Sequence, residues 1–212
     1  TGKEKYRRAM DTVYSQLKEQ PRTSTGNFWH KKIYPHQIWL DGLYMAQPFY
    51  MQYEAEYNGC KNCEDSYQQF LQVYGRMRDP LNGLYYHAYD DSRQMFWCDK
   101  VTGLSENFWL RAMGWYAMAL IDTMEVMPES MACQKARLNA IYKELIDAML
   151  PYQDQATGMW YQVVNRGGIA PNYLEESGSA IFAYAIMKSV RLHYLPEEYF
   201  KYGQKAFDGI CS

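Results

Sequence analysis

The sequence predicts an all-α protein, an α/α toroid built from helical hairpins. Apolar residues recur at helical spacing through most of the chain, and alternating strand-like stretches are short. In addition, three loops open on a glycine followed by aromatic residues, at Gly26, Gly83 and Gly158, and each leads into a helical stretch. The repeating unit is therefore a loop, an inner helix, a short turn and an outer helix, which is what a ring of hairpins in two layers requires.

Seven helices are expected from the apolar periodicity. They cover residues 2–19, 42–57, 62–77, 105–126, 129–150, 174–193 and 197–210. The stretch 105–126 is apolar on all sides, as an inner helix should be, with Ser105 as its expected N-cap, whereas 129–150 has a polar side suited to an outer helix. Residues 83–89 and 158–164 are expected to form short hairpins or extended segments within loops.

A toroid of six hairpins needs twelve helices, and this chain supplies seven. Residues 1–212 are therefore expected to form a single α/α-toroid domain that is either a smaller ring or a partial segment of a longer catalytic domain. The length is sufficient for one domain with a substantial core.

The composition excludes several classes of partner. The formal net charge of −2 argues against a nucleic-acid surface, which needs a basic stripe. No stretch is apolar enough to span a membrane, and no signal peptide is visible. Aromatic residues make up 17% of the chain, and their flat faces suit sugar or peptide surfaces as well as the core, where most are expected to pack.

The sequence indicates no metal site and no cofactor. Five cysteines in a chain of this size do not resemble a disulfide scaffold. A zinc site at the lone Cys60-Lys61-Asn62-Cys63 motif would need a second ligand pair, and none is evident, so the motif is interpreted as structural or incidental. Neither a helical pair of metal-binding histidines nor a phosphate-binding loop occurs.

Asp41 is the best candidate for a catalytic group. It stands at the start of an apolar helix, where an aspartate commonly serves only as an N-cap. The neighbouring Trp29 and Trp39 would desolvate its carboxyl group and raise its pKa, whereas His30 and Lys31 would lower it. A carboxyl group under such opposed influences can exchange protons near neutral pH.

Trp109, Arg111 and Trp115 form a second candidate cluster on one expected helix. An arginine in an otherwise apolar inner helix needs a carboxylate partner. That partner is either internal, Asp41 or Glu175, or an acidic substrate. The two tryptophans would suit a sugar ring.

The loop histidines carry a weaker signal. His87 lies in an aromatic loop, and His30 and His36 lie in another, and each taken alone is more often structural. The three junctions together nevertheless place histidine, aspartate, arginine, glutamate and tryptophan at successive ends of helices, which predicts one shared pocket.

These segments resemble glycoside hydrolase family 105, the unsaturated rhamnogalacturonyl hydrolases, which are related to the unsaturated glucuronyl hydrolases of family 88. The resemblance spans nearly the whole chain. It rests on Trp29-His-Lys31, Gln37-Ile-Trp-Leu-Asp-Gly-Leu-Tyr-Met-Ala46, Gly83-Leu-Tyr-Tyr-His87, residues 103–120 and Tyr173-Leu-Glu-Glu-Ser-Gly-Ser-Ala180.

The resemblance implies an (α/α)6 barrel and a reaction on a 4,5-unsaturated uronic acid at the end of a pectin-derived, rhamnogalacturonan oligosaccharide. Asp41 would protonate C4 and then activate a water for attack at C5, after which the product opens and releases the neighbouring sugar. Such a group needs a pKa near the working pH. Arg111 would bind the uronate carboxylate, and Glu175 would be structural. The substrate-binding positions implied are His30, His87, Trp109, Arg111 and Trp115.

Two alternatives stay open at this stage. The chain is a non-catalytic carbohydrate-binding toroid, or it is a toroid hydrolase that uses two carboxylates on ordinary glycosides. Family members carry further helices upstream, one of which supplies a second acidic residue, so we expect about two thirds of the full protein here. The sequence leaves the oligomeric state undefined and the compartment open between cytoplasm and periplasm for a bacterial-type soluble enzyme.

Overall fold

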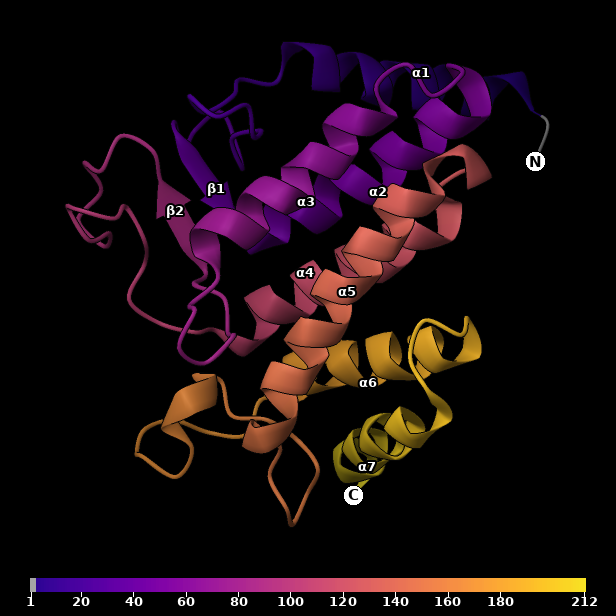
Figure 1. The fold of residues 1–212 in the computed structure, drawn as a ribbon. Coiled ribbons are helices and arrows are strands. Elements are labelled where there is room, and N and C mark those ends of the chain that lie inside the picture. Colours follow the sequence, from indigo (N-terminus) through magenta and orange to yellow (C-terminus); the bar gives the residue numbers. More distant parts are fainter. Residues whose placement is uncertain (1–2) are drawn as a thin grey trace.

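The computed structural model describes residues 3–212, which form two layers of helices (Figure 1). Its elements are α1 (Glu4–Glu19), β1 (Gln37–Trp39), α2 (Leu40–Tyr57), α3 (Cys63–Met77), β2 (Ala88–Asp90), α4 (Leu110–Val126), α5 (Ala132–Met149), α6 (Glu176–Arg191) and α7 (Phe200–Cys211), with short 3-10 turns η1 (Glu129–Met131), η2 (Leu150–Tyr152), η3 (Val164–Arg166) and η4 (Glu197–Tyr199). Helices α2, α4 and α6 form the inner layer, in which α4 packs between the other two. Helices α3, α5 and α7 cover them from outside, each beside the inner helix that precedes it.

This arrangement confirms the prediction of an all-α protein made of hairpins. The described residues hold seven α-helices, and their only sheet is the antiparallel pair β1–β2. Inner helices that lie side by side, each with its own outer partner, are the layering of an α/α toroid. Within residues 3–212, no helix has the length and apolar character needed to cross a membrane.

Most predicted helix starts differ from the structure by one to three residues, and the two differences that bear on the site lie at the loop ends of inner helices. Helix α2 begins at Leu40, so Asp41 lies inside its first turn and is not the N-cap. Helix α4 begins at Leu110 instead of residue 105. Ser105 is not a cap, because its backbone N–H donates to the Ala88 carbonyl at 2.9 Å and its Oγ accepts from the Ala88 N–H at 3.1 Å. Pairing with the β2 strand thus holds this segment extended.

Three turns of one kind begin at Asp79, Asp99 and Asp154. In each, the aspartate carboxylate accepts hydrogen bonds from the next residues of the turn. Its carbonyl accepts from the N–H of a glycine four positions later, at 2.8–2.9 Å. These glycines have φ between 76° and 80°, a left-handed conformation that favours glycine. Two of them are the glycines that marked the loops in the sequence, so the repeat signal comes from this turn.

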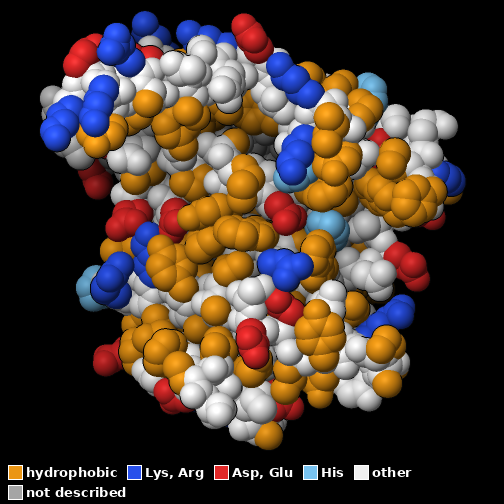
Figure 2. Space-filling view, turned by 180° about the vertical axis from the view of Figure 1, so that it is seen from behind, with side chains coloured by type: hydrophobic (Ala, Val, Ile, Leu, Met, Phe, Trp, Pro, Cys, Tyr) orange, Lys and Arg blue, Asp and Glu red, His pale blue; other side chains and the backbone are white. Residues whose placement is uncertain are grey.

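Close contacts between inner helices explain two further glycines. A Cβ at Gly114 of α4 would lie 3.0 Å from the side chain of Ile181 in α6, and a Cβ at Gly178 would lie 2.6 Å from Leu110. Ser179, next to Gly178, is also buried, and its Oγ accepts from the Trp160 N–H at 3.0 Å. On the face opposite that of Figure 1, hydrophobic side chains form a broad band (Figure 2).

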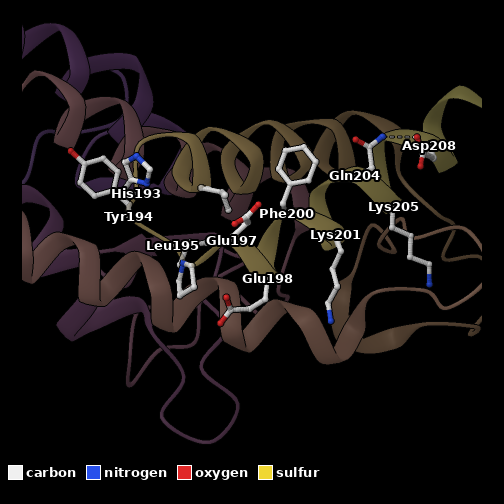
Figure 3. Close-up of a pocket in the computed structure, with 12 residues that line it drawn as sticks. His193, Tyr194, Leu195, Glu197, Glu198, Phe200, Lys201, Gln204, Lys205 and Asp208 are labelled. Atoms are coloured by element: carbon white, nitrogen blue, oxygen red, sulfur yellow. Dashed lines mark hydrogen bonds between the residues drawn. The ribbon is translucent and has the colours of Figure 1, made fainter.

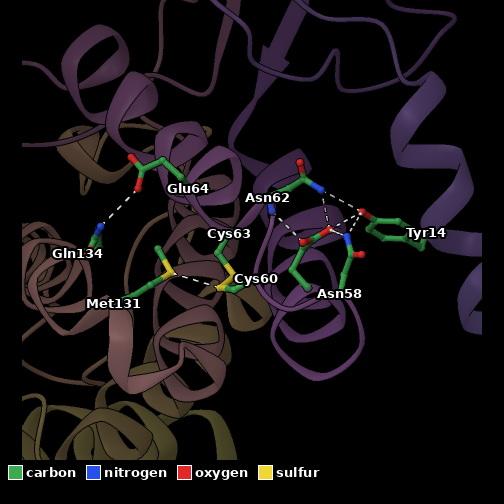
Figure 4. Close-up of a disulfide and its surroundings, with 9 residues drawn as sticks. Tyr14, Asn58, Cys60, Asn62, Cys63, Glu64, Met131 and Gln134 are labelled. Carbon is green, nitrogen blue, oxygen red and sulfur yellow. Dashed lines mark hydrogen bonds between the residues drawn. A yellow bond between two sulfur atoms is a disulfide. The ribbon is translucent and has the colours of Figure 1, made fainter.

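Cys60 and Cys63 form a disulfide in the turn between α2 and α3 (Figure 4). The interpretation of this motif as structural is therefore confirmed, although a disulfide was not expected from it. The last turn of α2, just before it, holds a buried carboxylate, that of Glu54. Its hydrogen-bond donors are the side chains of Tyr14, Asn58 and Asn62 and the backbone N–H of Asn62. The turn thereby ties α1 to the α2–α3 hairpin.

Candidate active site

The loops that precede the inner helices lie on one side of the molecule, at the left of Figure 1. Each is joined to the next by backbone hydrogen bonds. The Leu40 N–H at the start of α2 donates to the His87 carbonyl at 3.1 Å, and the Leu110 N–H at the start of α4 donates to the Gln162 carbonyl at 2.9 Å. The first N–H groups of a helix have no partner within it, so these bonds satisfy a need that the helix itself creates.

Asp41 and His87 meet at the first of these junctions. His87 Nε2 lies 3.3 Å from Asp41 Oδ2, and each side chain is about one fifth exposed. The contact is close enough for an ion pair, but the two atoms are not aligned as a hydrogen bond. The structure thus brings together two predicted site residues that lie far apart in the sequence.

Aromatic rings hold the two histidines of the site. His87 packs edge-on against Trp39 at 5.2 Å and against Trp109 at 4.7 Å between ring centroids. His30 stacks on the other side of the junction, parallel to Trp39 at 4.5 Å, and Trp39 in turn stacks on Tyr34 at 5.0 Å. The sequence had not indicated Tyr34, whose separation from Trp39 matches no helical or strand spacing.

The pKa of the Asp41 carboxyl is lowered, which corrects the expectation of a value near neutral pH. Burial is the largest influence and acts to raise this pKa, but the adjacent His87 imidazole opposes it, with smaller contributions from the Asp41 backbone N–H and from His30. The combined lowering effects prevail. Trp29, expected beside Asp41, packs against His36 at 4.7 Å between ring centroids. Asp41 is therefore ionised, as a carboxylate, at neutral pH.

His30 is a neutral imidazole at neutral pH. Burial lowers its pKa to about 4, and the charges of Lys31 and His87 act in the same direction, while Asp41 opposes them. Its Nδ1 would lie 3.0 Å from a Cβ placed on Gly42, so the ring lies against the first turn of α2. A side chain at position 42 would push His30 away from the site.

The carboxylate partner of Arg111 is Glu175, one of the two internal partners expected from the sequence. Its Nη1 lies 3.0 Å from Glu175 Oε1 and 3.2 Å from Ser177 Oγ, and its guanidinium lies over the Trp109 ring at 4.6 Å. Glu175 is buried, and its side chain also caps α6 by accepting from the Gly178 N–H. The Arg111 side chain is 36% exposed, so guanidinium N–H groups remain available to a ligand.

Trp115 lies one turn of α4 further on, where it packs against a residue that the sequence had not indicated. Its ring centroid is 5.0 Å from that of Tyr44 in α2. Both rings are partly exposed, and together they present apolar surface between the first two inner helices.

The cluster contains polar atoms that the described residues leave unsatisfied. Among residues 3–212, four of its atoms are buried without a hydrogen-bond partner: His30 Nδ1, Asp41 Oδ2, His87 Nε2 and Trp109 Nε1. An unpaired buried polar group is costly, so such a concentration in one place favours a site that binds a polar ligand.

A cavity elsewhere in residues 3–212 has no such unsatisfied buried polar atoms. It measures about 1260 Å³ and lies between the end of α6 and α7, where its charged side chains are spread along the loop and one helix (Figure 3). The side chains of Glu197, Glu198 and Lys201 are exposed to solvent, and no lining residue has an unsatisfied buried polar atom. We therefore place the candidate site at the helix junctions. In residues 3–212, no group of three or more histidine, cysteine or acidic residues is suitably placed to hold a metal ion.

The fold and this site place the chain among the α/α-toroid proteins with a candidate ligand site at the loop ends of the inner helices. The chain belongs to Glycosyl Hydrolase Family 88, whose family model matches residues 1–212. A C. acetobutylicum glycoside hydrolase from family 105 has a similar structure, with a TM-score of 0.94 and 47% sequence identity, over 99% of this chain and 58% of that one. The resemblance inferred from the motifs is thereby confirmed.

Two curated relatives are also similar. Protein Atu3128 of Agrobacterium fabrum is 38% identical over 154 residues, which are 73% of this chain and 64% of that protein. The unsaturated rhamnogalacturonyl hydrolase YesR of Bacillus subtilis is 29% identical over 202 residues, which are 92% of this chain and 53% of that protein. The chain thus spans between about half and two thirds of the length of these relatives.

Proposed function

We propose that the protein to which this chain belongs removes a 4,5-unsaturated uronic acid from pectin-derived oligosaccharides by adding water across the double bond. The observation that carries the proposal is the Asp41 carboxylate, whose Oδ2 lies 3.3 Å from His87 Nε2 with no aligned hydrogen bond within residues 3–212. A carboxyl group with an unsatisfied oxygen, in a cluster of aromatic rings, is suited to exchange protons with a bound sugar.

The proposed reaction uses Asp41 twice. Its protonated carboxyl group gives a proton to C4 of the sugar, and the double-bond electrons form the new C–H bond and leave positive charge at C5. A water attacks C5 and gives a proton back to the Asp41 carboxylate. The product is a hemiketal at C5, which opens and releases the neighbouring sugar. One water is consumed, and Asp41 ends in its starting state.

Substrate binding supplies the protonated form that the first step needs. Alone, Asp41 is ionised, because its pKa is lowered chiefly by His87 against the effect of burial. A bound uronate brings a second negative charge close to this carboxylate and displaces water from it. Both changes penalise the charged form of Asp41 and raise its pKa. The donor is therefore created when the substrate binds.

Arg111 is proposed to bind the uronate carboxylate. Its guanidinium uses Nη1 for Glu175 and Ser177, and its partly exposed remainder can present a second pair of donors. Trp109 and Trp115 would shape the sugar pocket, and His30 and His87 would contact the sugar. The name of YesR supports rhamnose as the neighbouring sugar. The domain is proposed to continue beyond these 212 residues, and the compartment, cytoplasm or periplasm, stays a prediction.

The Asp41→Asn variant of the intact protein tests this proposal. We expect kcat on an unsaturated rhamnogalacturonan disaccharide to fall by a factor of about 1000 or more, because the amide can neither give nor take the proton. The ultraviolet absorbance of the double bond measures turnover. Asp208→Asn, at an exposed position of α7, is the control and should be fully active. Undiminished turnover by Asp41→Asn would reject the assignment.

Two other outcomes of the same assay would identify the alternatives. Saccharide binding without turnover by the intact wild-type protein would indicate a non-catalytic carbohydrate-binding toroid. Cleavage of saturated substrates as fast as unsaturated ones would indicate ordinary glycoside hydrolysis by two carboxylates.

A further inference from the structure

The loop before α6 repeats the backbone arrangement of the loop that carries His87. The His87 carbonyl accepts from the Leu40 N–H at the first residue of α2, and the Gln162 carbonyl accepts from the Leu110 N–H at the first residue of α4. The residues that follow them also correspond. Ala88 pairs with Trp39, the N-cap of α2, and Val163 pairs with Trp109, the N-cap of α4. Gln162 therefore occupies the position of His87 in the next repeat.

The sequence supports the same correspondence. His30, His87 and Gln162 each follow the turn glycine of their own loop by four positions. The first two lie at the candidate site, where their rings pack on Trp39. Nothing in the composition of the third loop marked its glutamine, because a glutamine in a loop is ordinary. The register between the loops shows the equivalence, and the spacing from the glycines agrees with it.

The helix residue at the junction differs between the two repeats, because it is Asp41 in α2 and Arg111 in α4. Asp41 and Arg111 are each the second residue of an inner helix, directly after the N-terminal residue that is paired with the loop. His87 contacts Asp41, with its Nε2 3.3 Å from Asp41 Oδ2. In the second repeat, Gln162 is bonded to Leu110, the residue directly before Arg111, so Arg111 is the counterpart of Asp41 for Gln162.

The backbone of Gln162 is fixed by hydrogen bonds, whereas its side-chain amide has no hydrogen-bond partner among residues 3–212. Its N–H donates to the Tyr173 carbonyl at 2.9 Å, and its own carbonyl accepts from Leu110, so the segments on both sides fix its main chain. The residue is partly buried, and its amide makes no hydrogen bond to any other group of residues 3–212 that meets ordinary geometric limits. A fixed and unused amide beside a cationic site residue is available to a ligand.

We infer that Gln162 is a further substrate-binding residue, whose side-chain amide donates a hydrogen bond to the uronate carboxylate held by Arg111. This inference rests on the proposed function. An arginine that uses part of its fork for Glu175 leaves carboxylate oxygens of the substrate in need of another donor. The glutamine N–H2 group supplies such a donor and carries no charge.

The test compares Gln162→Ala with Gln155→Ala in the intact protein, using an unsaturated disaccharide. Gln155 is an exposed glutamine of the same loop, so it is the matched control. We expect Gln162→Ala to raise KM by a factor of about 10, the loss of one hydrogen bond to a charged group, with kcat changed much less and the thermal midpoint unchanged. Gln155→Ala should match the wild-type protein in all three.

A second variant and a second substrate show which group is bound. Gln162→Glu should raise KM further than Gln162→Ala, because a carboxylate at this position repels the uronate. With the methyl ester of the same disaccharide, Gln162→Glu should lose this additional penalty, since the ester carries no charge. A purely structural role for Gln162 would change the thermal midpoint and affect both substrates alike, and that result would overturn the inference.

The remaining outcomes separate this inference from the proposed function. Wild-type turnover together with an unchanged KM for Gln162→Ala would overturn the role of Gln162 and leave the function in place. An intact wild-type protein that neither binds nor converts the unsaturated disaccharide would overturn both.

Discussion

The first and second loop–helix junctions share one backbone plan and differ in chemistry. At the first junction, the second residue of the inner helix is Asp41, whose contact with His87 is close but poorly aligned. At the second junction, the equivalent residue is Arg111, which makes two aligned hydrogen bonds, to Glu175 and Ser177. The first junction leaves the Asp41 Oδ2 atom unsatisfied, whereas the second holds its charged group in place.

Under the proposed function, equivalent positions of the repeated backbone have different roles. A group that transfers protons must exchange partners during the reaction, so a fully satisfied hydrogen-bond set would hinder it. A group that binds a carboxylate works best when it is oriented before the ligand arrives. The backbone of the repeat fixes both positions, and the side chains of the following loop set how tightly each is held.

After Asp41→Asn, the largest effect is expected from Arg111→Ala, which removes the proposed binding group of the second junction. KM for the unsaturated disaccharide should rise by a factor of about 100, because a charge-assisted, two-donor contact is lost. Steady-state kinetics on the intact protein measures it. Arg166→Ala, in the exposed turn η3, is the control.

An Arg111→Ala enzyme with the wild-type KM would show that Arg111 serves only to pair Glu175. A thermal midpoint measured on the same sample separates loss of binding from loss of folded protein.

A smaller effect is expected from His87→Ala, which changes the first junction. The imidazole is a main cause of the lowered pKa of Asp41, so its removal should move that pKa upward. The alkaline limb of the kcat profile, where Asp41 loses the proton it must donate, should then shift to higher pH. The exposed His193→Ala variant should leave the profile unchanged. A shift of the alkaline limb to lower pH would contradict the assigned cause.

The same pKa has a consequence for stability. The folded-state pKa of Asp41 lies below its ordinary value, so its contribution to stability is present above the unfolded-state pKa and is lost as the pH falls through the folded-state value. The His87→Ala protein should lose less stability than the wild type over that acidic range, as acid titration of unfolding would show.

The smallest effect is expected from Glu175→Gln, which loosens the tightly held junction. Glu175 caps α6 and pairs with Arg111, and its neutral replacement should lower the free energy of unfolding by about 1–2 kcal/mol. Urea unfolding measures this change. Glu176→Gln, at the exposed neighbouring position, should have little effect. Equal unfolding midpoints for the two variants would show that the cap and ion pair add nothing.

The sequence predicted the helices well and their starts poorly. Apolar periodicity located all seven helices found in residues 3–212, because it reflects which side of each helix is buried. The start of α4 was placed too early, since Ser105 has the chemistry of a cap but is bonded to Ala88 of a distant strand. Local residue preferences cannot register such a long-range competitor.

The site residues were recognisable from the sequence, and their relationships were not. Asp41 and Arg111 stood out because polar side chains are unusual beside apolar helices, whereas His87 was indicated by the family resemblance. Their partners, Glu175 for Arg111 and Tyr44 for Trp115, lie more than sixty residues away along the chain and are set by the packing of α2, α4 and α6. The roles of the individual site residues stay predictions.

By itself, the amino-acid sequence determined the helices, the glycine turns and the residue types at each junction, because these depend on neighbours within a few positions. The tertiary structure alone decided that His87 meets Asp41, that the pKa of Asp41 is lowered, and that Gln162 takes the place of His87 in the next repeat. These features arise where separate loops are bonded side by side, and the strength of a charge or a hydrogen bond depends on distances that only the packed chain defines.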